Sequence, residues 1–145
     1  MPDDKQKKRL AAALDYYKSL YIFQDYEITS PTSHGMDEDT PIHMAAYDGR
    51  IDFINDMLPF VKDINIRGDI GNTPLHYAVM RSNISAAEFL LTHGADIMRG
   101  NDYDDTPLEW MSLNPQFNNL IKKVLNNNHP EQTHPDLPFP LNTDN

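Results

Sequence analysis

Apolar residues recur at helical spacing in several separate stretches of the chain. The first stretch has apolar residues at i, i+4, i+7 and i+11, with charged residues on its other side: Leu10, Leu14, Tyr17 and Tyr21. Three later stretches have apolar clusters of the same kind: Ile51, Phe53, Ile54, Met57 and Leu58; Phe89, Leu90 and Leu91; and Phe117, Leu120, Ile121 and Val124. Such spacing indicates helices with one face on a core. The pattern predicts a helix over residues 5–24 and three further amphipathic helices.

A pattern of six residues precedes these later helices and occurs three times, at intervals of 33 residues. Its copies are Thr40-Pro41-Ile42-His43-Met44-Ala45, Thr73-Pro74-Leu75-His76-Tyr77-Ala78 and Thr106-Pro107-Leu108-Glu109-Trp110-Met111. A threonine hydroxyl caps the free N–H groups of a helix start, and proline fits the next position because no N–H is needed there. The constant interval predicts three stacked repeats, each with an inner and an outer helix.

The six-residue pattern resembles the ankyrin repeat, whose hallmark is T-P-L-H-x-A at a 33-residue period. The resemblance covers residues 35–125, with two good repeats and one capping repeat, and implies an all-α solenoid with short β-hairpin fingers before each Thr-Pro pair. It also implies that His43 and His76 are structural. Three positions depart from the family pattern: Val61-Lys62 replaces Gly-Ala, Ser82-Asn83 replaces Gly-His, and Glu109 replaces histidine. We expect a distorted corner at Val61 and a capping box from Thr106 to Glu109.

The two ends of the chain lack the repeat pattern. Residues 1–34 are predicted to form an N-terminal helical cap, which a repeat stack needs on its open face. Residues 126–145 contain four prolines, which favour an extended tail: Pro130, Pro135, Pro138 and Pro140. Leu137, Phe139 and Leu141 alternate along this tail. We expect the tail to lie extended against its own domain or against a partner.

Composition limits the class of protein. The chain has 145 residues, 39% of them apolar, which is enough for one domain with a core. No run of about 18 apolar residues suggests a membrane span, and no secretory signal is visible. Cysteine is absent, which excludes disulfides and thiol catalysis and fits a cytoplasmic location.

The charge is strongly acidic and unevenly distributed. The net charge is −10, and four of the twelve basic residues lie in the first nine positions. A nucleic-acid binder needs a basic footprint, so this composition argues against nucleic acid as a partner. The acidity serves either solubility or the attraction of a basic protein partner.

The sequence carries no recognisable catalytic or metal site. No H-E-x-x-H, G-x-S-x-G, Walker or G-x-G-x-x-G pattern is present. The aspartates at 37–39 and 102–105 lack the spacing of an EF-hand loop. We therefore predict a protein without catalysis, cofactor or metal.

Equivalent positions of stacked repeats form rows, and two such rows are candidates for binding a partner protein. The first comprises the acidic fingers with their tips: Asp37, Asp39, Asp69, Ile70, Asp102, Tyr103 and Asp105. The second lies on the inner helices: Tyr47, Tyr77, Met80, Arg81, Trp110 and Leu113. In the alternative interpretation, Met44, Tyr77 and Trp110 belong to the core and the acids are only solvated.

The predicted function is a protein–protein interaction module that binds through its concave face and acidic fingers. A small ankyrin protein acts by occupying a surface, so inhibition of a basic enzyme is the favoured mechanism, in the manner of a toxin's immunity protein. The alternatives are an adaptor joining two partners, one of them on the tail, and an enzyme whose site is not readable from sequence.

Overall fold

The structure is a computed structural model that describes residues 1–127. Its α-helices are α1 (Asp4–Lys18), α2 (Pro41–Tyr47), α3 (Ile51–Met57), α4 (Pro74–Met80), α5 (Ile84–Thr92), α6 (Pro107–Ser112) and α7 (Asn118–Asn127). Single turns of 3-10 helix lie between them: η1 (Tyr21–Phe23), η2 (Met36–Glu38), η3 (Leu58–Phe60), η4 (Asp69–Gly71) and η5 (Pro115–Phe117).

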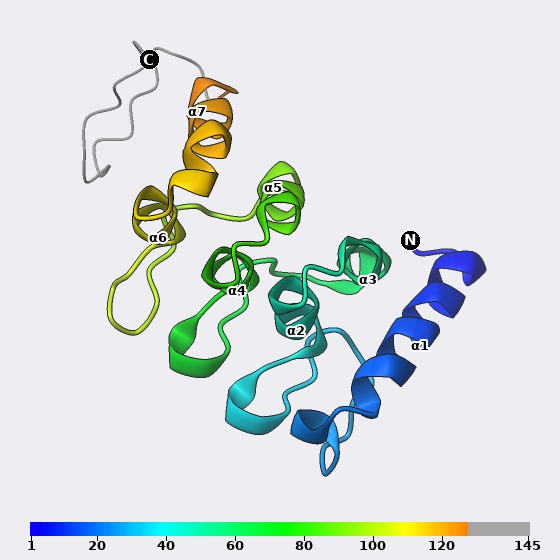
Figure 1. The fold of residues 1–145 in the computed structure, drawn as a ribbon. Helices are drawn as coiled ribbons and strands as arrows, with labels where there is room; N and C mark the ends of the chain where they lie inside the picture. The colour runs from blue at the N-terminus through cyan, green and yellow to red at the C-terminus, as the bar shows by residue number, and fades with distance from the viewer. Residues whose placement is uncertain (128–145) are drawn as a thin grey trace.

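Six of the helices form three stacked pairs. The inner helices α2, α4 and α6 pack in one row, and the outer helices α3, α5 and α7 pack in a second row behind them (Figure 1). The N-terminal helix α1 packs on α3 at the open end of the stack. This arrangement confirms the all-α repeat architecture expected from the 33-residue interval.

Small and apolar side chains of the repeated pattern occupy the centre of the stack. Ala45, Ala78 and Met111, which hold the same place in the three repeats, are fully buried. Alanine at this place lets neighbouring inner helices approach closely, so Ile54 and Leu90 of the outer helices and Phe117 of η5 can close the core behind them.

The N-terminal cap differs in detail from its prediction. Leu14 and Tyr17 are buried, and the Tyr17 ring packs against Phe53 of α3 with ring centroids 5.4 Å apart. However, α1 ends at Lys18, not near residue 24, and Tyr21 is 75% exposed. The chain has left the α-helix before Tyr21, so the spacing of i+11 from Leu10 no longer places it on the buried stripe.

Helix ends follow local chemistry in the repeats. Helix α3 stops at Met57 and Pro59 lies in a 3-10 turn, because proline cannot continue a helix interior. Between α4 and α5, Ser82 adopts a positive φ of 56°, although asparagine, the next residue, tolerates the left-handed region better. The Asn83 amide instead donates hydrogen bonds to the carbonyls of Ala46 (3.1 Å) and Tyr47 (2.8 Å).

The fingers are turns, and the expected β-hairpins are absent from the described residues, which contain no strand. One backbone hydrogen bond closes each finger: Gly35 N–H to Asp39 O (2.7 Å), Gly68 N–H to Asn72 O (2.8 Å), and Asn101 N–H to Asp105 O (2.9 Å). A five-residue loop closed in this way leaves no room for a ladder of pairs, and the first two tips form single 3-10 turns.

The last helix continues further than the sequence predicted. Helix α7 continues through Asn127, so the predicted tail does not start at residue 126. The proline-rich segment with Leu137, Phe139 and Leu141 lies outside the described residues. Within residues 1–127, no helix is both long and apolar enough to cross a membrane.

Candidate binding surface

A threonine and a histidine build the start of each of the first two inner helices. The Thr73 hydroxyl caps the backbone N–H of His76, and the Thr73 N–H donates to Nδ1 of the same imidazole (3.0 Å). Because Nδ1 accepts, Nε2 carries the proton and donates it to the carbonyl of Asp105 (2.8 Å). Thr40 and His43 repeat this unit, with Nε2 donating to the carbonyl of Ile66 (2.9 Å).

Each histidine thus ties its own helix to the finger region of the next repeat. Burial lowers the pKa of His43 to about 4 and also lowers the pKa of His76, so both imidazoles are neutral at pH 7. This confirms the structural role expected of the two residues.

The third repeat starts its inner helix with fewer bonds. The Thr106 hydroxyl caps the N–H of Glu109 (3.1 Å), as predicted. The Glu109 carboxylate, however, accepts from the Thr106 hydroxyl (3.3 Å), whereas a complete capping box would need the Thr106 N–H.

The three fingers lie in a row (Figure 1), and hydrogen bonds join each finger to the next. The Asp39 carboxylate accepts from the Asp69 N–H (3.1 Å), and the Ile70 carbonyl accepts from the Asp102 N–H (2.9 Å). A further hydrogen bond joins the side chains of Asn101 and Asn72 (3.0 Å). The row is therefore a connected array, and the tips are held at fixed positions relative to each other.

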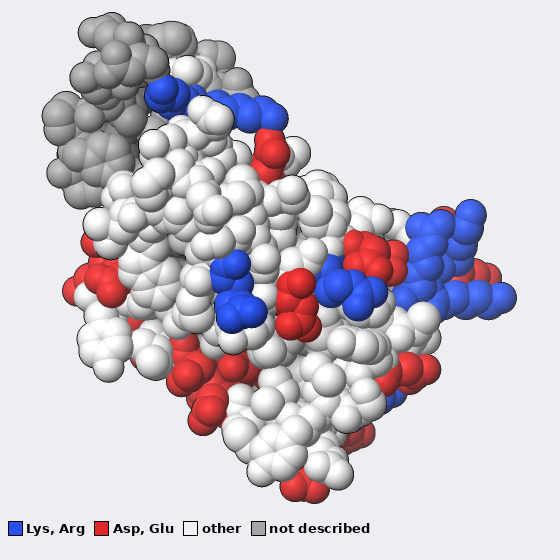
Figure 2. Space-filling model, viewed as in Figure 1, with Lys and Arg blue, Asp and Glu red and all other residues white. Residues whose placement is uncertain are grey.

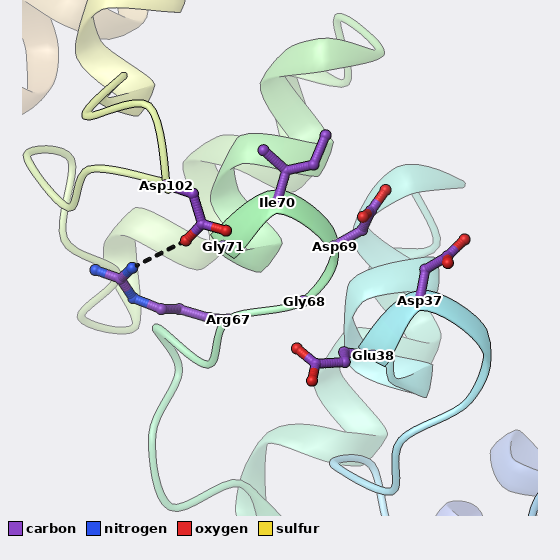
Figure 3. Close-up of a pocket in the computed structure, with 8 residues that line it drawn as sticks. All are labelled: Asp37, Glu38, Arg67, Gly68, Asp69, Ile70, Gly71 and Asp102. Carbon is purple, nitrogen blue, oxygen red and sulfur yellow. Dashed lines mark ion pairs between the residues drawn. The ribbon is translucent and has the colours of Figure 1, made fainter.

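Carboxylates from all three fingers lie around the turn of the central finger (Figure 3). Asp37, Glu38 and Asp102 are exposed, and Asp102 pairs with Arg67 at 3.6 Å. Partial burial, and then the nearby charges of Asp37 and Asp39, raise the pKa of Asp69. The carboxylates of the fingers therefore repel one another, and a cation placed among them would relieve that repulsion.

The acids are separated from the main basic cluster of the chain. In the space-filling view, red side chains gather over the first two fingers along the lower edge, and blue ones gather at the N-terminal end of α1 (Figure 2). The α1 cluster consists of the exposed Lys5, Lys7, Lys8 and Arg9.

Exposed apolar side chains accompany the acids. Within residues 35–126, the large hydrophobic residues that are exposed all lie on finger tips or at the ends of inner helices: Ile70 (43%), Tyr103 (73%), Met80 (46%) and Leu113 (81%). We call the three fingers together with the ends of α2, α4 and α6 the finger surface. Up to residue 126, the outer helices present no exposed side chain of this kind.

Comparison with known families agrees with this architecture. A family model described as ankyrin repeats (3 copies) matches residues 10–101 and residues 42–134. The chain belongs to the ankyrin-repeat family. Ankyrin repeats generally mediate protein–protein interaction and are typically non-catalytic. A search of curated proteins gave no significant match.

The ankyrin stack brings most of the predicted contact residues to the finger surface, but it buries Tyr77. This ring is only 6% exposed, and its hydroxyl donates to the Asp39 carboxylate. Tyr77 and Asp39 therefore stabilise the finger array from within, and the hydrogen-bonded groups of these two residues are not partner contacts. The interpretation of Tyr77 as a core residue, left open by the sequence, fits its burial.

The other inner-helix candidates are half-buried or exposed. The Trp110 ring packs edge-on against His76, with ring centroids 5.0 Å apart, and stays half-buried. The exposed Arg81 places its guanidinium 4.9 Å from the ring centre of the half-buried Tyr47. Trp110, Arg81 and Tyr47 are therefore each at least partly exposed to solvent along the inner helices of the ankyrin stack.

Sequence reasoning missed three residues of the finger array. Asn72, Asn101 and Arg67 hold the fingers together and were not singled out. Asn72 ends the second finger and Asn101 opens the third, and asparagine in turns often bonds to the backbone. The asparagines could therefore have been found from the local sequence. The ion pair of Arg67 with Asp102 could not, because it forms only when two repeats stack. In residues 1–127, no group of three or more potential metal ligands is present.

Proposed function

We propose that this ankyrin protein is a stoichiometric binder of a basic protein and that it inhibits a basic enzyme by covering part of its surface. The observation that carries this proposal is the coincidence of exposed apolar and acidic side chains on the finger surface. Each class of side chain alone would be ordinary, since proteins expose scattered hydrophobic residues and need charge for solubility.

The apolar component supplies a reason for close contact. Ile70 and Tyr103 stand on the connected finger array, Met80 and Leu113 lie at the ends of inner helices, and such residues inside a polar rim are typical of protein interfaces. Burying an aromatic or a large aliphatic side chain in a partner pocket commonly contributes ~2 kcal/mol or more to binding. The array is hydrogen-bonded internally, so little ordering is required on association.

The acidic component selects the partner. Seven carboxylates lie on the three fingers: Asp37, Glu38, Asp39, Asp69, Asp102, Asp104 and Asp105. Of the nearby basic residues, Arg67 pairs with Asp102 and Arg81 lies on Tyr47. A surface with this charge attracts a basic protein and accelerates its association.

Affinity capture from a lysate of the source organism tests the proposal. The full-length chain should capture one basic protein in stoichiometric amount at low salt, and capture should weaken at about 0.5 M salt because the Debye length shrinks to a few ångströms. Inhibition of that protein's activity by the purified chain would complete the case. Capture that is insensitive to salt, or only of acidic proteins, would contradict it.

Two matched variants separate finger charge from total charge. The first neutralises three exposed finger acids, as D37N, D102N and D104N, and asparagine suits the positive φ of Asp37 and Asp104. The control neutralises three exposed acids of the N-terminal segment, as D15N, D25N and E27Q. Both variants change net charge equally, and we expect capture of the partner to weaken only for the finger variant.

An adaptor remains the alternative, because a second exposed apolar group lies at the N-terminal end. Its members are Tyr16 (42%), Tyr21 (75%) and Tyr26 (46%). A scaffold would hold two proteins at once, one on the finger surface and one here or on residues 130–145. Deletion of residues 130–145, and separately a Tyr21→Ser, Tyr26→Ser variant, should leave capture unchanged for an inhibitor and remove one of two captured proteins for an adaptor.

A further inference from the structure

Ile70, at the tip of the central finger, has a backbone conformation that its residue type disfavours. Its φ is 57° and its ψ is 23°, in the left-handed region. A branched Cβ clashes with the backbone there, so isoleucine rarely adopts it. The first finger makes the same turn with Asp37, at φ 57°, and aspartate tolerates this region far better. The turn itself therefore does not require isoleucine.

Packing within the protein does not explain the isoleucine either. The side chain is 43% exposed. In the close-up it extends from the outer side of the turn, away from Glu38 and Arg67 (Figure 3). A polar residue at this tip would be accommodated with less strain and more hydration.

The surrounding structure holds this strained residue in place from both sides. On one side its carbonyl accepts from the Asp102 N–H (2.9 Å), and on the other the Asp69 N–H donates to the Asp39 carboxylate (3.1 Å). The next residue, Gly71, also has a positive φ, and a Cβ there would come within 2.2 Å of the Asp102 carboxylate. Strain that is fixed by its neighbours in this way is characteristic of functional positions.

From these observations we propose that Ile70 is a preorganised anchor, which inserts into an apolar pocket of the partner. This inference rests on the proposed function and specifies its central contact. The partner pocket would be bordered by lysine or arginine side chains, because Asp37, Asp69 and Asp102 lie around Ile70 (Figure 3). An anchor that is rigid before binding loses little conformational freedom on contact, so its buried area contributes efficiently to affinity.

Three substitutions at position 70 separate strain from contact. Ile70→Asn relieves the strain and removes the apolar contact, so thermal denaturation should show a Tm about 3 °C higher. Ile70→Leu removes the branch at Cβ but keeps an apolar side chain, so it should raise Tm and retain most of the affinity. Ile70→Val keeps both the strain and the contact and serves as the matched control.

The probe for binding is a phage-displayed random-peptide library, selected on the immobilised full-length chain. We expect enriched peptides to combine lysine or arginine with large apolar residues. Their affinity, measured by calorimetry, should fall at least ~10-fold for Ile70→Asn and stay within ~3-fold for Ile70→Val. If Ile70→Asn has both a higher Tm and a lower affinity, Ile70 is an anchor that strengthens binding and lowers the stability of the fold.

The outcomes distinguish this inference from the proposed function. Basic, salt-sensitive peptides that bind Ile70→Asn as tightly as the wild type would overturn the anchor and leave the acidic finger surface standing. Enrichment of peptides without basic residues, or no enrichment, would contradict both. An unchanged or lower Tm for Ile70→Asn would show that the conformation of Ile70 is not strained, which also overturns the proposal.

Discussion

Two neutral histidines connect the repeats of this protein, and each uses both of its ring nitrogens. Nδ1 of His43 and of His76 accepts from the threonine at its own helix start, and Nε2 donates to a carbonyl of the following finger region. Protonation would place a donor on Nδ1, where a donor already points at it, and would put a charge in the core. The residues that join the repeats are therefore also sensitive to pH.

The stability of the protein should fall as pH falls below about 6.5. In the unfolded chain a histidine binds its proton near pH 6.5, but burial lowers the pKa of His43 to about 4 in the folded protein. Between these values the unfolded state binds more protons, so lowering the pH favours unfolding. From pH 7.5 to pH 5, His43 alone should remove about 2 kcal/mol of unfolding free energy.

Urea unfolding at the two pH values measures this loss. His76, whose pKa is also lowered by burial, adds in the same direction. A His43→Asn variant, although less stable at pH 7.5, should show a smaller decrease between pH 7.5 and pH 5. Equal stability of the wild type at both pH values would contradict the assignment of neutral, buried imidazoles.

Exposed apolar residues of the inner-helix ends should matter for binding and little for folding. Leu113 is 81% exposed, so Leu113→Ser should leave Tm within about 2 °C, since surface substitutions are usually near neutral. The affinity for the captured partner should fall at least ~10-fold if Leu113 is an interface residue. Asn118→Ser, at an exposed position of α7, is the control and should bind as the wild type. Unchanged affinity for Leu113→Ser would remove the inner-helix end from the finger surface.

At the scale of the element, the Thr-Pro helix start is the feature that sequence predicted best. The chemistry of capping acts within four residues, so the pattern alone located the starts of α2, α4 and α6. The fingers were predicted less well. The family resemblance implied β-hairpins, but the loops of this chain are too short for strands to pair. The sequence left the burial of Tyr77 open, and it could not predict the hydrogen bond from the Tyr77 hydroxyl to Asp39 of the preceding repeat, which forms only when the repeats stack.

The conformation of Ile70 shows the same limit for a backbone angle. Isoleucine carries no local tendency toward positive φ, so nothing in the sequence around it signals the left-handed turn. Hydrogen bonds from the neighbouring fingers hold that conformation, and they exist only after the repeats have stacked.

Loss of the central cap should destabilise the protein more than loss of the last one. Thr73 is fully buried and bonds to the N–H and the imidazole of His76, which in turn holds the third finger. Thr73→Ala should cost about 2 kcal/mol in urea unfolding, and Thr106→Ala about 1 kcal/mol. Thr73→Ser keeps the hydroxyl and should lie close to the wild type. A larger loss for Thr106→Ala than for Thr73→Ala would show that the repeats are not linked through His76.

For the whole molecule, the separation of charge defines how a partner would approach. Residues 1–9 hold four of the twelve basic side chains, whereas the fingers hold seven of the twenty-two acidic ones. The N-terminal end of α1, with its four basic side chains, and the finger surface therefore present opposite charges. A basic protein would be directed to the fingers before any apolar side chain is in contact.

The measurement that tests the account most directly is the association rate of the captured partner as a function of ionic strength. Stopped-flow fluorescence of Trp110, the single tryptophan, can follow mixing of the wild type and of the D37N, D102N, D104N variant. For the wild type we expect the association rate to fall at least ~10-fold between low salt and about 0.5 M salt. The finger variant should associate more slowly at low salt and depend less on salt, with a similar dissociation rate. Identical rates for the two proteins at every salt concentration would contradict a binding surface built on the acidic fingers.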